Sequence, residues 1–148
     1  MMQQHNIGLF RRLFAMMYDG FLLIAILFIV TGAATALNHG KAIEPEDDFY
    51  PFFVIIVFMH IYLYFSWFWI HGGQTLGMKT WRIRLVHIDD KGINWKIATI
   101  RFIAALLSWG TFMLGFLWSL VDRKKRCWHD IISKTELRDL RPGRQRTG

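Results

Sequence analysis

Residues 13–37 read LFAMMYDGFLLIAILFIVTGAATAL, an apolar stretch of 25 residues in which Asp19 is the single charged side chain. Two further stretches, residues 49–70 and 102–121, are apolar over 22 and 20 residues and contain no Lys, Arg, Asp or Glu. An α-helix needs about 20 apolar residues to cross the hydrocarbon core of a bilayer. All three stretches are therefore long enough to span, and we predict an all-α integral membrane protein.

The composition of the 148-residue chain agrees with this class and excludes others. Hydrophobic residues make up 53% of the chain, and the formal net charge is +7. A positive charge is also typical of nucleic-acid-binding proteins, but those need a basic, water-soluble surface, and here the charges are segregated from the apolar stretches. We therefore expect no nucleic-acid partner. The single cysteine, Cys127, excludes an intrachain disulfide and the Cys-rich zinc sites.

The charges that flank the apolar stretches predict the orientation in the membrane. Residues 1–12 carry two arginines and no acid, whereas residues 38–48 carry one lysine against four acids. Residues 71–101 carry six basic and two acidic side chains. Because basic loops stay in the cytoplasm, we expect a cytoplasmic N-terminus, an external acidic loop and a cytoplasmic segment 71–101.

The third stretch conflicts with a simple crossing. Residues 122–148 carry nine basic and four acidic side chains, so the charge rule places both flanks of residues 102–121 in the cytoplasm. The polar residues and glycine at positions 108–111 are a plausible break in the helix. We predict two full transmembrane helices plus a broken or re-entrant third element. Three full transmembrane helices are the alternative.

Segment 71–101 is predicted to form a small cytoplasmic hairpin. Apolar and polar residues alternate over residues 80–88, which indicates a strand, and residues 89–92 are a turn signal. Residues 93–95 are the expected returning strand, lying on the bilayer surface. The basic tail, residues 138–148, is predicted to be disordered and to contact anionic lipid headgroups.

Asp19 is the most informative residue of the chain. It lies six positions inside the first span, and a carboxylate at that depth must be protonated, paired or directed into a wet cavity. Two interpretations remain open, a polar staple between helices and a functional proton or ion site. The candidate polar partners, chosen by depth in the second span, are Tyr62 and Ser66, with His60 as a more distant relay or staple.

Charged residues at the cytoplasmic side provide a second group of candidates. Arg12 is seven residues before Asp19, too far for a direct backbone-level ion pair, and is better placed to meet Asp122 or Asp130. Arg101 and His129 are further polar candidates. Cys127, His129 and Asp130 are metal-ligand types, but they are too few for a predicted metal site, and we expect no cofactor.

Three sequence patterns in order resemble the RDD family of small prokaryotic membrane proteins. The first is RLFAMMYDG at residues 12–20, the second is GQTLGMK at 73–79 followed by IRLV at 83–86, and the third is WHD at 128–130 followed by SKT at 133–135. The resemblance covers residues 9–137 and assigns the family arginine and aspartates to Arg12, Asp19 and Asp130, with Asp122 in reserve. It implies a multi-pass protein of the prokaryotic cytoplasmic (inner) membrane with transport activity, such as monovalent cation/proton exchange.

Two functions follow from these observations; we favour the first, and the second is the alternative. In the first, the protein is a small transporter or transporter component in which Asp19 takes and releases a proton. Because two or three spans do not enclose a path, this function needs a homo-oligomer or a partner. In the second, it is a non-transporting accessory or scaffold protein that binds another membrane protein and anionic lipid. We do not expect an enzyme, because the sequence shows neither a nucleophile–base pair nor a metal-ligand set.

Overall fold

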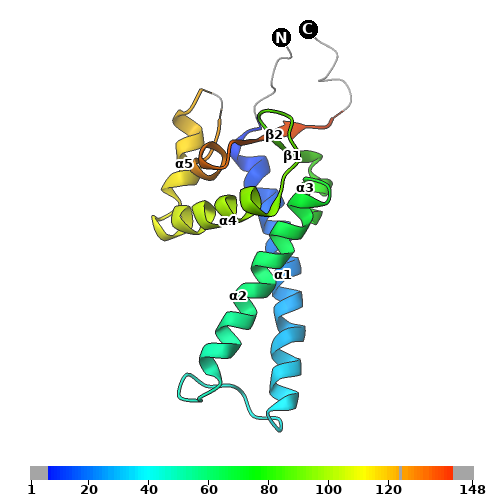
Figure 1. The fold of residues 1–148 in the computed structure, drawn as a ribbon, viewed down its shortest axis with the longest axis vertical. Helices are drawn as coiled ribbons and strands as arrows, with labels where there is room; N and C mark the ends of the chain where they lie inside the picture. The colour runs from blue at the N-terminus through cyan, green and yellow to red at the C-terminus, as the bar shows by residue number, and fades with distance from the viewer. Residues whose placement is uncertain (1–6, 124, 142–148) are drawn as a thin grey trace.

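The computed structural model describes residues 7–123 and 125–141 and consists mainly of an antiparallel helical hairpin with a small cap at one end (Figure 1). The hairpin is formed by α1 (Leu9–Leu37) and α2 (Tyr50–Ile70). Both helices are long and apolar enough to cross a membrane, with mean hydropathies of 2.4 and 1.9. The two predicted full spans are confirmed, and α1 begins four residues earlier than the first apolar stretch.

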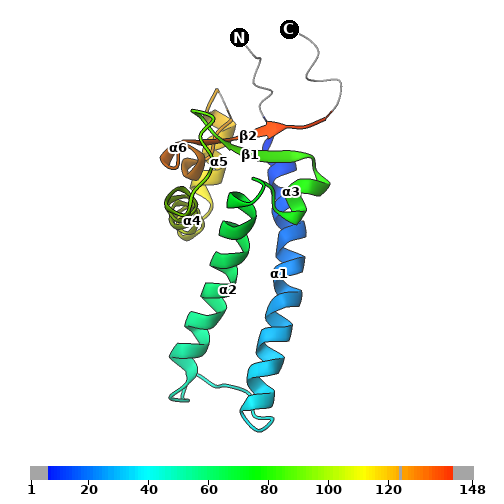
Figure 2. The ribbon, with the colours of Figure 1, turned by 45° about the vertical axis from the view of Figure 1, so that its right-hand side comes forward.

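The cap combines segments that are far apart in the sequence. It contains α3 (Leu76–Thr80), β1 (Ile83–His87), α6 (Trp128–Ile132) and β2 (Thr135–Asp139), gathered beyond one end of the hairpin (Figure 2). The two strands are antiparallel, and Leu85 on β1 lies opposite Leu137 on β2.

The predicted hairpin within residues 71–101 is wrong in its second strand. The first strand and the turn form as expected, but the partner of β1 is β2, about 50 residues further on. Asn94 instead begins a helix, because its side chain accepts a hydrogen bond of 2.9 Å from the backbone N–H of Ile97. The prediction of a disordered tail from residue 138 is also wrong at its start, since Arg138 and Asp139 belong to β2. Residues 142–148 lie outside the described part of the chain.

The third apolar stretch forms two helices rather than one. They are α4 (Trp95–Gly110) and α5 (Leu114–Val121), which meet at an angle of 96°. Phe112 and Met113 between them adopt left-handed backbone conformations, with φ of 52° and 62°. The predicted break is confirmed, although it falls slightly later than residues 108–111, and the first helix begins seven residues before the apolar stretch.

The pairing of β1 with β2 favours an even number of crossings between the two strands. Hydrogen-bonded strands lie on the same side of a membrane, so the chain between them must leave and return on that side. In agreement, α4 runs across the hairpin, as the two views together show (Figures 1 and 2). From this pairing we infer two crossings plus a bent element, whereas by length and composition alone the bent pair could also form a third span.

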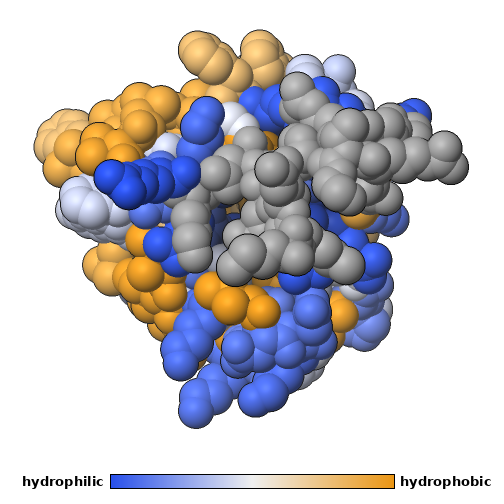
Figure 3. All heavy atoms as spheres, turned by 90° about the horizontal axis from the view of Figure 1, so that it is seen from above, coloured by the Kyte–Doolittle hydropathy of each residue, from blue (hydrophilic) through white to orange (hydrophobic). Residues whose placement is uncertain are grey.

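The α4–α5 element presents an apolar surface beside a polar cap. Seen from the cap end, hydrophilic residues cover much of the cap, whereas the side that carries α4 and α5 is largely hydrophobic (Figure 3). Large side chains there are strongly exposed, among them Leu107 at 63%, Trp109 at 57% and Phe112 at 92%. A helix that lies across the spans with such a surface fits the membrane interface, partly immersed in lipid.

A small core joins the cap to the hairpin. Trp69 at the end of α2 packs with Leu85 of β1 and with Ala98 and Phe102 of α4, and all four side chains are buried. The two polar clusters described next also join the cap to the hairpin.

Candidate functional site

Asp19 on α1 is 2% exposed and accepts three hydrogen bonds. The donors are the hydroxyl of Tyr64 at 2.9 Å, the hydroxyl of Thr75 at 2.5 Å and the backbone N–H of Gly77 at 2.8 Å. Thr75 also caps α3, because its hydroxyl accepts from the backbone N–H of Met78 at 3.2 Å. The carboxylate thus ties α1 to α2 and to the first turn of α3, and we refer to these four groups as the Asp19 clamp.

The polar partners predicted for Asp19 are wrong. Tyr62 is hydrogen-bonded to Thr99 of α4 at 2.7 Å, the hydroxyl of Ser66 is buried without a partner, and His60 is bonded to the carbonyl of Ile56 in its own helix at 2.8 Å. The predicted depth was right, since Tyr64 lies between positions 62 and 66. However, two residues correspond to a rotation of about 200° around a helix, so positions 62 and 64 point to nearly opposite sides of α2. The depth of a residue in the membrane does not specify its side of the helix, and depth alone therefore selected the wrong side chain.

Thr75 and Gly77 were missed as partners of Asp19, although both lie in the pattern at residues 73–79. The glycine at position 77 is itself a signal of a close contact, because α3 approaches α1 very closely there. A Cβ atom at this position would overlap the carbonyl oxygen of Ala15 and lie 3.0 Å from the carboxyl carbon of Asp19. Only glycine lets the backbone N–H of residue 77 reach the carboxylate.

The second cluster is centred on Asp130, which is completely buried. One carboxylate oxygen accepts from Nη1 of Arg101 at 2.7 Å, and the other accepts from Nη1 of Arg12 and from the backbone N–H of Cys127 at 3.1 Å. Arg101 also donates to the hydroxyl of Thr135 at 2.6 Å. The cluster therefore joins α1, α4, α6 and β2, and we call it the Asp130 clamp.

The structure distinguishes between the two acids considered as partners of Arg12. Asp122 pairs with Arg126 at 3.2 Å in a partly exposed position. Arg12 instead contacts Asp130 and donates through Nη2 to the carbonyl of Lys125 at 2.8 Å. The ion pair between Arg11 and Asp139, at 2.6 Å, is a further link between α1 and the cap that the sequence analysis missed.

The electrostatics of the Asp130 clamp follow from its burial and its two arginines. Burial by itself raises the pKa of Asp130, but the guanidinium groups of Arg101 and Arg12 outweigh it, so this pKa lies well below its ordinary value. Burial lowers the pKa of His129 to about 3, and both arginines contribute in the same direction. His129 is therefore neutral at pH 7, and the clamp contains two positive charges and one negative charge.

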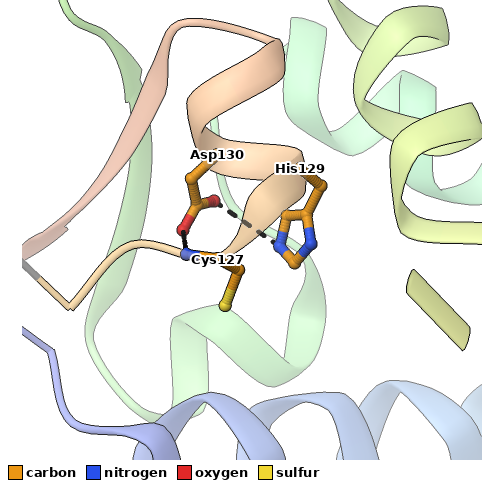
Figure 4. Close-up of side chains that lie close together, drawn as sticks. All are labelled: Cys127, His129 and Asp130. Atoms are coloured by element: carbon orange, nitrogen blue, oxygen red, sulfur yellow. Dashed lines mark hydrogen bonds and ion pairs between the residues drawn. The ribbon is translucent and has the colours of Figure 1, made fainter. Parts of the chain in front are cut away.

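Cys127, His129 and Asp130 bring three ligand-type atoms within 4.8 Å of one another (Figure 4). Both oxygens of Asp130 already accept from guanidinium groups, and Nη1 of Arg12 lies 3.3 Å from the sulfur of Cys127. Burial also raises the pKa of the Cys127 thiol, which disfavours the thiolate that a metal needs. The donor set fits an ion-pair cluster better than a metal centre.

Taken together, the two clamps hold a small cap onto a pair of membrane-spanning helices, and this arrangement defines a helical multi-pass membrane protein. The sequence model of the RDD family matches residues 7–134, so the chain belongs to the RDD family. Neither the comparison with curated proteins nor the comparison with solved structures found a match.

Proposed function

We propose that this protein is a non-transporting accessory protein of the membrane, which docks another integral membrane protein and contacts anionic lipid. The observation that carries the proposal is the hydrogen bonding of Asp19, which is the single acid inside a span. Its carboxylate is held by three donors from the chain itself, so the charge serves to fix the cap. A proton relay needs an acid that can exchange its proton with water or other groups along a path. The carboxylate of Asp19 is instead bound by donors that hold the cap in place.

A second candidate function is the exchange of a monovalent cation for a proton, with Asp19 as the proton site. One observation favours it, because Asp19 is among the residues that line a cavity between the helices. Two spans do not enclose a path, so this function also requires a homo-oligomer or a partner.

We further propose that the protein is not an enzyme, because its sequence shows neither a nucleophile–base pair nor a metal-ligand set. The thiol of Cys127, the single cysteine, is also fully buried.

Flux measurements separate the two functions. The purified protein is reconstituted into liposomes that contain a pH-sensitive dye, and Na⁺, K⁺ or Li⁺ is added outside. We expect the wild type to give the same proton flux as empty liposomes. Cation-dependent flux that disappears in Asp19→Asn would instead establish transport and overturn the accessory proposal.

The exposed face of α2 is the proposed docking surface. Ile55 and Phe58 are 59% and 52% exposed, on a helix with aromatic side chains along its length. A photoreactive residue at position 58 is expected to give one cross-linked adduct of defined mass in native membranes. The control is the same photoreactive residue at a position in the polar loop, such as Lys41. An adduct of twice the chain mass would identify a homo-oligomer. Cross-links to lipid alone would contradict docking.

We also propose that the membrane is the prokaryotic cytoplasmic membrane and that the cap faces the cytoplasm. The support is the charge distribution, since the basic segments lie at the cap end and the acidic loop at the other. A cysteine at Lys41 is expected to react with an impermeant thiol reagent in intact cells, and a cysteine at Arg138 is not. The wild type, whose Cys127 is buried, is the control. The reverse labelling pattern would invert the orientation.

A further inference from the structure

A cavity of about 660 Å³ lies between the hairpin and the α4–α5 element. This is within the range of about 300–1,000 Å³ that is typical of small-molecule sites. Its walls are mostly apolar and come largely from α1, α2, α4 and α5, whereas Arg12, Asp19, Arg101 and His129 contribute a polar part. The carboxylate of Asp19 is already bound by the three donors of the Asp19 clamp. The cavity is therefore amphipathic, with a long apolar region and a polar region that contains two arginines.

The apolar part of the cavity is accessible from the lipid side. Three of its lining residues are strongly exposed, namely Phe21 at 65%, Ile24 at 52% and Trp109 at 57%. Phe21 and Ile24 lie within the membrane-spanning α1, and Trp109 lies on the exposed face of α4. A hydrophobic molecule can consequently reach the cavity from the bilayer without passing through water.

Arg101 offers an unused hydrogen-bonding edge. Within residues 7–123 and 125–141, only its Nη1 is engaged, with Asp130 and Thr135, while Nε is buried without a partner and no hydrogen bond of Nη2 is found. The side chain is 2% exposed, and its guanidinium lies 5.2 Å from the ring centre of Trp69, which fixes its plane. The Nε and Nη2 groups of a guanidinium together bind a carboxylate or phosphate in a bidentate manner.

The charge of the cluster also calls for an anion. Two buried guanidinium groups face one carboxylate, and Nε of Arg12 is buried without a partner as well. Asp19 does not supply the missing charge, because its donors are Tyr64, Thr75 and Gly77, and it forms no ion pair with either arginine. An uncompensated buried charge is costly, and a bound anion relieves that cost.

We propose that the cavity binds an anionic amphiphile, with a carboxylate or phosphate head on the free edge of Arg101 and an acyl chain along the apolar walls. A free fatty acid and an anionic phospholipid share this chemistry. The inference goes beyond the lipid contact in the proposed function, because it concerns a defined cavity of the isolated protein and holds whether or not the protein docks a partner.

Native mass spectrometry of the full chain in mild detergent tests the site. The probes are palmitate, phosphatidylglycerol and a phosphatidylcholine with the same acyl chains. We expect one molecule of palmitate or phosphatidylglycerol per chain, with an affinity at least about tenfold above that for phosphatidylcholine, as one charge-assisted interaction provides. Comparison of the two anionic probes identifies the source of the head group.

Two variants with matched controls locate the binding. Arg101→Gln removes the free edge, and its control is Arg84→Gln at an exposed position on β1. Gly20→Phe places a bulky ring on the cavity wall and leaves both arginines in the chain, because Gly20 is a lining residue. Its control is Gly32→Phe, since a Cβ at either glycine meets nothing within 4 Å. We expect both test variants to lose at least about tenfold in affinity and both controls to keep it.

Three results would overturn the proposal. One is equal binding of phosphatidylglycerol and phosphatidylcholine, and another is full binding of the anionic probes by Gly20→Phe. The third is that the wild type binds none of the probes and is a dimer, and that Gly20→Phe dissociates this dimer. That result would mean that a second copy of the chain fills the cavity. If Arg101→Gln does not fold, Gly20→Phe still decides the question, because it leaves the Asp130 clamp intact.

Discussion

Replacement of Asp130 by asparagine is expected to destabilise the folded protein by about 3–5 kcal/mol, because two buried guanidinium groups lose their shared counter-charge. Arg12 and Arg101 are 6% and 2% exposed, so water does not replace the carboxylate. The amide of asparagine offers one acceptor oxygen, whereas the carboxylate uses both of its oxygens. The measurement is thermal unfolding in detergent, followed by circular dichroism.

Asp122→Asn is the matched control for this prediction. Asp122 also pairs with an arginine, but both side chains are partly exposed, so we expect a loss of about 1 kcal/mol or less. A second readout is alkylation of Cys127, which is fully buried and should become reactive when the cap detaches in Asp130→Asn. Equal stability of the Asp130→Asn and Asp122→Asn variants would show that the Asp130 clamp does not hold the cap.

Replacement of Asp19 by leucine is the second change with a large expected effect. It leaves three donors without their acceptor, namely the buried hydroxyl of Thr75, the N–H of the buried Gly77 and the hydroxyl of the half-buried Tyr64. Each unsatisfied buried donor costs about 1–3 kcal/mol, whereas a half-buried hydroxyl is more accessible to water. We therefore expect a total loss of at least about 2 kcal/mol. Asp19→Asn should lose less, because its amide oxygen still accepts from Tyr64 and Gly77. Thermal unfolding of the three proteins gives the order Asp, Asn, Leu.

The close approach of α3 to α1 provides an independent test of the same clamp. Gly77→Ala introduces a methyl group into the carbonyl of Ala15, and the resulting overlap is expected to cost about 1–3 kcal/mol and to weaken the contact with Asp19. Gly72→Ala is the control, since a Cβ there meets nothing within 4 Å. If Asp19→Leu and Gly77→Ala both unfold like the wild type, the carboxylate does not secure the cap.

The sequence was sufficient for the class and the number of spans. Length and hydropathy identify α1 and α2 because the bilayer requires about 20 apolar residues, a condition that is local and can be counted. The basic flanks of the third stretch predicted that it is broken or re-entrant, and the 96° bend confirms the break. The sequence patterns around Arg12, Asp19 and Asp130 were sufficient for the RDD family.

The partners of the polar side chains could not be read in the same way. Depth placed the partner of Asp19 near positions 62–66, but the rotation of α2 and the folding back of Thr75 and Gly77 decided which groups reach it. Both depend on how two helices pack, which involves residues that are about 45–60 positions apart.

The cap was predictable only as separate strands and turns. The alternation in β1 indicated a strand, and the nearest candidate partner was the segment 93–95, because short loops are the usual connection. The actual partner, β2, is reached only after α4, α5 and α6 have packed. The sequence thus determined that the chain enters the membrane and where, because burial in lipid acts on each segment alone. The tertiary structure alone decided how Arg12, Arg101 and Asp130 meet, because an ion pair needs three helices to bring their charges to one point.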